Sequence, residues 1–343
     1  MLNIKGLATG IGSLPYKNAE EASDIVFKYL SQIPFWPQLP KRSLREGMVA
    51  QFGENFPCLE VTDDGLLYRA QNKEGQLERF YAKIIEQDLA YFNISPNCSE
   101  GIYSFHNSLR SRNIDEVRFI KCHITGPFTF AASVKDENGA MLLHDEIFLQ
   151  AFTKGLAMKA LWQASLFKEF NKDIIIFIDE PYLGCFGSAY TPITRDKVVS
   201  CLRELTEGIK SKNIFIGIHC CGNTDWSIFT DVPGIDIINF DAFGFLDKFV
   251  LYAQDLKRFL QRGGAICWGI VPTQEFTGKE DPQQLILRLN NGIDSLSNKG
   301  LDSDLIRERL FVSPSCGLGS LDVERADRIL RVLNHLSKQL QLQ

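Results

Sequence analysis

Residues of the kinds that bind metal ions follow three apolar runs of the sequence. The run F-I-G-I ends in His219, Cys220 and Cys221. The run I-D-I-I-N-F ends in Asp241, and L-F-V-S-P leads to Cys316. Side chains two residues apart on an extended chain point to the same side, so His219 and Cys221 should aim together. If the ends of these runs meet, the two cysteines, the histidine and the aspartate would form a four-ligand zinc site.

The cysteines also admit a structural interpretation. A buried cysteine often behaves as a small apolar residue, which would account for Cys220 and for those scattered elsewhere. The nine cysteines are odd in number and dispersed, so they do not indicate a disulfide framework. The structural interpretation explains less well why His-Cys-Cys-Gly and Ser-Cys-Gly both follow apolar runs.

Two adjacent carboxylates follow another buried run. The apolar stretch I-I-I-F-I ends in Asp179, Glu180 and Pro181. Charged groups are costly to bury, so we expect Asp179 and Glu180 to bind substrate, and Asp179 to serve in catalysis with the metal ligands. The alternative is a helix cap or a structural ion pair.

Three further features are candidates for the same site. The motif G-I-G-S-L-P places Ile11, Gly12 and Ser13 in a turn whose N–H groups and hydroxyl could hold a carboxylate, although a plain turn is the alternative. His123 ends a predicted strand, where a structural role is favoured over a role in the pocket. The turn-rich segment 35–64 is an insertion that we expect to cover the mouth of the site.

The order of predicted elements indicates the fold class. Helical periodicity recurs between most of the apolar runs, and no linker or repeat divides the chain. Eight β/α units in a chain of this length are typical of a TIM barrel. We therefore predict one domain over residues 1–343, a (β/α)8 barrel with the insertion after its first unit. Strands are expected near residues 4, 58, 117, 174, 214, 235, 265 and 310.

Composition limits the partners. The net charge is −5 and the basic residues are dispersed, so a nucleic-acid partner is not expected. No apolar run reaches the length of about 20 residues needed to span a bilayer. The amino-terminal residues M-L-N-I-K lack the apolar core of a secretory signal, and we therefore expect a cytoplasmic protein without membrane association.

Taken together, G-I-G-S-L-P, I-D-E-P, H-C-C-G, I-N-F-D-A and S-P-S-C-G-L resemble the catalytic barrel of cobalamin-independent methionine synthase. The wider superfamily includes uroporphyrinogen decarboxylase and corrinoid-linked methyltransferases. The resemblance implies zinc bound by His219, Cys221, Asp241 and Cys316. It also implies that Ile11, Gly12 and Ser13 hold the carboxylate of homocysteine and that Asp179 holds its amino group.

The sequence also departs from this family. Methionine synthase has two similar barrels, and this chain resembles only the second. The family segment G-E-x-E-R-x-D-M-V appears as K-R-S-L-R-E-G-M-V, so a basic residue, Lys41 or Arg42, replaces the substrate-binding glutamate. The family's acidic zinc ligand is usually glutamate, and Asp241 has a shorter reach. The histidine of the seventh strand is replaced by the stretch G-I-V-P-T-Q-E.

The resemblance predicts a zinc-dependent methyltransferase that activates a small thiol such as homocysteine, as in methionine biosynthesis. The methyl donor would be a methylated corrinoid protein or another methylated compound. Two alternatives stay open. One is a lyase of the uroporphyrinogen decarboxylase type, whose acidic substrate would require arginines such as Arg42 and Arg45 at the mouth. The other is a non-catalytic binding protein stabilised by zinc.

Overall fold

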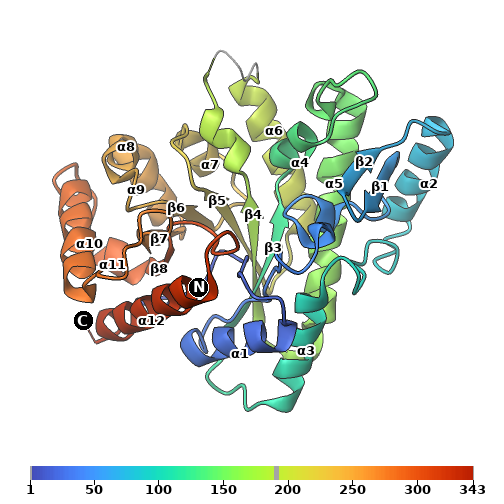
Figure 1. The fold of residues 1–343 in the computed structure, drawn as a ribbon. Helices are drawn as coiled ribbons and strands as arrows, with labels where there is room; N and C mark the ends of the chain where they lie inside the picture. The colour runs from blue at the N-terminus through green and yellow to red at the C-terminus, as the bar shows by residue number, and fades with distance from the viewer. Residues whose placement is uncertain (1, 189–192, 343) are drawn as a thin grey trace.

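The long apolar runs of the chain form one parallel sheet at the centre of the molecule (Figure 1). The computed structural model describes residues 2–188 and 193–342. Six strands pair in the order β3-β4-β5-β6-β7-β8. Their bounds are β3 Phe119–Thr125, β4 Asp173–Asp179, β5 Ile214–Cys220, β6 Ile237–Phe240, β7 Ala265–Val271 and β8 Leu310–Pro314.

Helices connect the strands and lie around the sheet (Figure 1). Within the described ranges, none of them is long and apolar enough to cross a bilayer. The α-helices are α1 Ala19–Tyr29, α2 Lys73–Ile85, α3 Glu100–Ser111, α4 Pro127–Ser133, α5 Glu146–Leu166, α6 Arg195–Ile209, α7 Ser227–Thr230, α8 Leu246–Phe249, α9 Ala253–Gln261, α10 Pro282–Ser297, α11 Ser303–Glu308 and α12 Val323–Leu340.

The two faces of the sheet bury different side chains because successive residues of a strand alternate in direction. The outer face packs against the helices and contributes to the larger hydrophobic cluster, with Ile176 and Ile178 of β4 as examples. The inner face belongs to a separate apolar cluster that includes Ile175 and Phe177 of β4 and Phe311 of β8. This alternation sends Asp179 to the inner face and Glu180 to the outer one.

The prediction of a closed (β/α)8 barrel is wrong. Among the described residues, six strands form the parallel sheet, and neither the run near residue 4 nor the run near residue 58 joins it as a strand. Instead, an isolated bridge between Ala8 and Val312 connects the first segment to β8. A second isolated bridge, between Phe35 and Lys121, connects the insertion to β3.

The physical reason lies in local turn chemistry. The run near residue 58 forms β1 (Leu59–Thr62), which pairs antiparallel with β2 (Gly65–Tyr68) across a two-residue connection. Gly65 adopts a φ of 113°, a value that favours glycine. Closing this short hairpin loses less chain entropy than pairing with a distant strand. The first segment carries glycines at positions 6 and 10, which weaken a regular strand.

Candidate metal centre

Three predicted ligands converge at the carboxyl end of the sheet. His219 lies near the end of β5, Cys221 directly follows that strand, and Cys316 follows β8. One potential ligand atom from each of the three lies within 4.8 Å of the other two. Metal–ligand distances in zinc sites are about 2.0–2.3 Å, so a small adjustment of these side chains would surround one ion. The donors therefore form a candidate metal site, and their chemistry suits a cation such as zinc.

His219 is oriented by a buried hydrogen-bond chain that the sequence analysis did not identify. The Asn239 side chain is fully buried, and its Oδ1 lies 2.5 Å from His219 Nδ1. Asn239 Nδ2 donates to the Cys267 carbonyl at 2.9 Å and to the Ser313 hydroxyl at 2.9 Å. Because the amide N–H groups are occupied, Asn239 Oδ1 accepts the Nδ1 proton, which leaves His219 Nε2 for a metal. A spacing of two residues from Asp241 was the sequence signal that Asn239 faces inward.

The three donors are electrostatically coupled. A hydrogen bond from the Cys221 thiol, together with the adjacent His219 ring, holds the pKa of Cys316 well below its ordinary value. The same hydrogen bond raises the pKa of Cys221, because that thiol keeps the shared proton. Burial acts to lower the pKa of His219, but the neighbouring Cys316 and Asp179 raise it overall. These contacts favour the thiolate form of Cys316, which is the form that binds cations.

Asp179 supplies a second reactive feature beside the metal donors. It ends β4, pairs in register with His219 of β5 and is 8% exposed. Burial raises the pKa of Asp179 to about 6, although His219 and Lys121 oppose the shift. Its Oδ1 atom is buried without a hydrogen-bond partner among the described residues. A buried carboxylate oxygen of this kind is suited to a positively charged or proton-donating ligand.

Glu180 does not share this environment, contrary to its predicted role in substrate binding. Its carboxylate accepts hydrogen bonds from the N–H groups of Phe128 and Thr129, both at 2.9 Å, and from the Thr129 hydroxyl at 2.6 Å. These donors belong to the first turn of α4. Glu180 therefore caps α4 on the outer side of the sheet. A helix cap was the alternative to substrate binding for the adjacent carboxylates Asp179 and Glu180.

Asp241 lies near the three donors but outside their group. The set of atoms within 4.8 Å of one another consists of His219, Cys221 and Cys316. Asp241 Oδ1 instead accepts a hydrogen bond from the Gly244 N–H at 2.7 Å, and burial raises the pKa of the carboxyl group. The structure thus brings together three of the four predicted ligands, which leaves one coordination position of a tetrahedral ion for another group.

The motif that contains Ile11, Gly12 and Ser13 forms part of the wall. Ile11 and Ser13 line the cavity beside the metal donors. Ser13 also secures the loop that carries Cys316, since its carbonyl accepts from the Leu318 N–H at 3.0 Å and its hydroxyl accepts from the Gly319 N–H at 3.1 Å. The Ser13 hydroxyl proton is still available for a ligand acceptor.

His123 packs behind this wall rather than in the cavity. Its ring stacks on Trp36 with centroids 3.8 Å apart, and the side chain is 2% exposed. A Cβ atom at Gly12 would lie 2.8 Å from the ring, so glycine is required at that position. Burial, with a contribution from Lys121, lowers the pKa of His123 well below its ordinary value, which favours the neutral form of the ring. These contacts agree with the structural role that the sequence favoured.

The donors and Asp179 open into a cavity of about 510 Å³. Part of the 35–64 insertion lies against it, and the neighbouring loop after β7 contributes Gln274. The lining residues are Ile11, Ser13, Gln38, Pro40, Lys41, Met48, Asp179, Pro181, His219, Cys221, Gln274, Cys316, Gly317, Gly319 and Ser320.

The structure distinguishes between the basic residues of the insertion. Lys41 lines the cavity. Arg42 forms ion pairs with Glu46 and Glu100 instead. Arg45 pairs with Asp63, with Nε and Oδ1 2.8 Å apart. The arginines are therefore engaged elsewhere, which weakens the case for an arginine-lined mouth of the lyase type.

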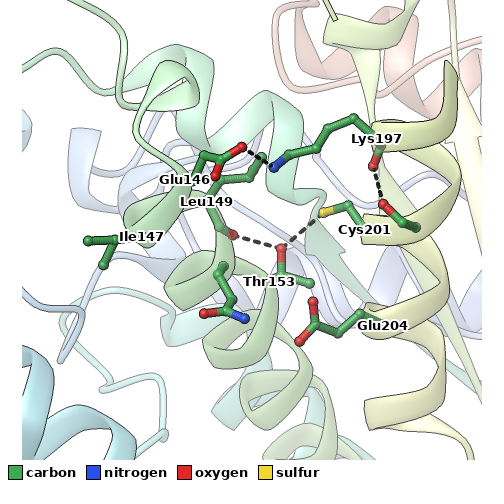
Figure 2. Close-up of a pocket in the computed structure, with 9 residues that line it drawn as sticks. Glu146, Ile147, Leu149, Thr153, Lys197, Cys201 and Glu204 are labelled. Atoms are coloured by element: carbon green, nitrogen blue, oxygen red, sulfur yellow. Dashed lines mark hydrogen bonds and ion pairs between the residues drawn. The ribbon is translucent and has the colours of Figure 1, made fainter. Parts of the chain in front are cut away.

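A second hollow lies between α5 and α6, away from the metal donors (Figure 2). Several of its polar groups bind one another, and Glu204 pairs with Lys154 outside the hollow. Thr153 Oγ1 lies 3.0 Å from Cys201 Sγ, and Lys197 Nζ lies 3.2 Å from Glu146 Oε1 (Figure 2). This groove contains no reactive cluster comparable to the one at the sheet end.

Comparisons with known proteins leave the family of this chain open. No family model matches the sequence, and no curated protein does. Among the solved structures, one from work on two fungal beta-1,4-galactanases matches with a TM-score of 0.38 and 12% sequence identity. That match covers 68% of this chain and 84% of the other. We draw no conclusion about fold or function from a likeness at this level.

Proposed function

We propose that this protein is a zinc-dependent methyltransferase whose acceptor is a small thiol, with homocysteine as the first candidate. The observation that supports it is the convergence of His219, Cys221 and Cys316 beside Asp179, whose Oδ1 has no hydrogen-bond partner in the described part of the chain. Two sulfurs and one imidazole nitrogen are ligands that zinc prefers. With three protein donors, one position is left for a substrate, which is typical of catalytic rather than structural zinc sites.

The ion, when bound by His219, Cys221 and Cys316, would supply a positive charge that lowers the pKa of a coordinating thiol. An ordinary alkyl thiol has a pKa of about 8.5 and is mostly protonated at neutral pH. Asn239 keeps the His219 ring in one orientation and one tautomer. The protein thereby maintains the donor geometry on which thiol activation depends.

The remaining cavity residues would orient the acceptor. Asp179 Oδ1 can accept hydrogen bonds from an ammonium group, and the Ser13 hydroxyl can donate to a carboxylate. In the transfer itself, the substrate sulfur forms a bond to the methyl carbon while the bond from that carbon to its donor atom breaks. The electron pair of the broken bond leaves with the donor, for which we propose a methylated corrinoid protein. Holding the thiol in one orientation lowers the activation free energy by several kcal/mol, and by about 7–11 kcal/mol at most in well-positioned reactions.

Metal analysis combined with thiol titration tests this proposal. The purified protein should bind one equivalent of zinc, and calorimetry should detect homocysteine binding to the zinc-loaded form but not to the metal-free form. Cys220→Ala serves as a matched control, because Cys220 is buried on the outer face next to the ligand Cys221. If zinc-loaded protein fails to bind any small thiol while chelation unfolds the chain, the protein is a zinc-stabilised binding protein and the proposal is wrong.

A further inference from the structure

One ammonium group faces the cavity. Among the described lining residues, Lys41 is the one lysine or arginine, and it is exposed at the rim. A turn positions it, since the Arg42 N–H donates to the Leu39 carbonyl at 2.9 Å and Pro40 occupies the second position of that turn. Leu39 is fully buried and anchors the turn. The backbone thus presents Lys41 toward the cavity and Arg42 toward its carboxylate partners.

The Lys41 side chain reaches across to the loop that carries Cys316. Its ammonium group donates to the carbonyl of Leu321. Pro40 lies against the same loop, because a Cβ atom at Gly319 would be 2.7 Å from Pro40 Cγ. An ammonium group has three donors, so this contact occupies one of them and leaves two for other acceptors. This contact links Lys41, at the exposed rim of the cavity, to the loop that carries Cys316.

The polar groups of the cavity are complementary to a zwitterion. Asp179 offers a buried oxygen that no described residue hydrogen-bonds, which suits an ammonium group. Lys41 offers a positive charge at the rim, which suits an anion. The two sulfur donors, Cys221 and Cys316, line the same cavity. A ligand with a thiol, an ammonium group and a carboxylate carries one complementary group for each of these three features.

We infer that Lys41 is a specificity-determining residue that binds the carboxylate of an amino-acid thiol, while Asp179 receives its ammonium group and the metal donors face its sulfur. This inference rests on the proposed function and deepens it, because it defines the substrate class as a zwitterionic aminothiol. A charged hydrogen bond of this kind typically changes affinity by about 10- to 100-fold.

Paired ligands separate the carboxylate contact from thiol binding. L-homocysteine carries the carboxylate, whereas 3-aminopropane-1-thiol is the same molecule without it. We expect Lys41→Gln to weaken binding of homocysteine to the zinc-loaded protein by about 10- to 100-fold and to leave binding of the aminothiol unchanged. Lys41→Arg, which keeps the charge and a donor for Leu321, should retain most of the homocysteine affinity.

Lys279→Gln provides a charge-matched control, since Lys279 is exposed and outside the cavity lining. Thermal unfolding of each variant reports whether loss of the contact to Leu321 disturbs the loop. The inference is overturned if Lys41→Gln binds homocysteine as wild type does, or if both ligands weaken equally. Wild-type protein that binds neither thiol would instead overturn the proposed function, and the inference with it.

Discussion

The inner face of the sheet differs between its two ends. At the amino end, the side chains are apolar and fully buried, as for Ile175, Phe177 and Phe311. At the carboxyl ends of β4 and β5, the polar residues Asp179 and His219 take the place of such apolar side chains. The first region contributes burial of apolar surface, which is the main stabilising term of folding. At the carboxyl end, burial removes water from polar side chains, which costs folding free energy. These side chains can in return bind a metal or a substrate.

Hydrogen bonds compensate for part of the free-energy cost of burying polar groups at the carboxyl end of the sheet. Asn239 is fully buried but its amide groups are all hydrogen-bonded, so its desolvation is compensated. Asp179 keeps one oxygen to which no residue within 2–188 and 193–342 donates a hydrogen bond, so a ligand can provide the missing donor. Stability and function should therefore respond separately to substitutions at the two ends, and four predictions test this separation.

Phe311→Ala should have the largest effect, and it should act on stability. Removing a fully buried aromatic ring from the amino end costs about 3–5 kcal/mol of unfolding free energy. Chemical denaturation measures the loss, and the folded fraction should still bind one equivalent of zinc. A loss of zinc binding without a loss of stability would show that the two ends are not separable.

Cys316→Ser should weaken zinc binding and leave the stability of the metal-free protein nearly unchanged, which is the reverse of Phe311→Ala. Removing a residue that only hydrogen-bonds to a metal ligand typically weakens metal binding by about 10- to 100-fold. Removing the sulfur ligand itself should therefore weaken zinc binding by more than about 100-fold. Competition with a chromophoric chelator measures the zinc affinity, and unfolding of the metal-free protein should change little. Cys220→Ala is the control and should bind zinc normally; unchanged affinity in Cys316→Ser would remove Cys316 from the ligand set.

Asn239→Ala should weaken zinc binding by about 10- to 100-fold, because His219 would lose the group that orients its ring. Ser313→Ala, one step further along the hydrogen-bond chain, should have a smaller effect of the same kind. The chelator competition assay reports both. Equal zinc affinity for wild type and Asn239→Ala would mean that the ring is held by packing alone.

Lys121→Met should have the smallest effect, and it tests an exception within the apolar end. Lys121 is fully buried on β3, and burial lowers its pKa to about 8. Below that pKa the wild type bears the desolvation cost of the charge. Attraction to the Asp179 carboxylate partly offsets this cost, as does the hydrogen bond from Lys121 Nζ to the Ile11 carbonyl at 2.5 Å. We expect the methionine variant to be more stable by about 1 kcal/mol at neutral pH.

The pH dependence has a defined sign. Between the folded pKa of about 8 and the ordinary lysine value of 10.5, the unfolded chain binds more protons than the folded chain. Wild-type stability therefore rises with pH in this window, and the advantage of Lys121→Met shrinks. Urea unfolding at about pH 7 and about pH 10 measures the difference. An advantage that grows with pH would show that Lys121 is not buried in its charged form.

Much of the site could be predicted from local sequence because strand alternation is a local property. The spacing of two residues placed His219 and Cys221 on one side, with Cys220 on the other, where it is fully buried. The same rule separates Asp179 from Glu180. Local sequence was less informative at Lys41 and Arg42, since a turn determines which of these neighbours faces the cavity.

The sequence by itself determined the parallel strands from β3 to β8 and the types of donor at their ends, because apolar runs and alternation act over a few residues. Only the tertiary structure decided that the first segments do not complete a barrel of strands, that Cys316 reaches His219 while Asp241 binds Gly244, and that Glu180 caps α4. Such outcomes depend on competition between distant partners for the same hydrogen bonds and space, which no short stretch of sequence encodes.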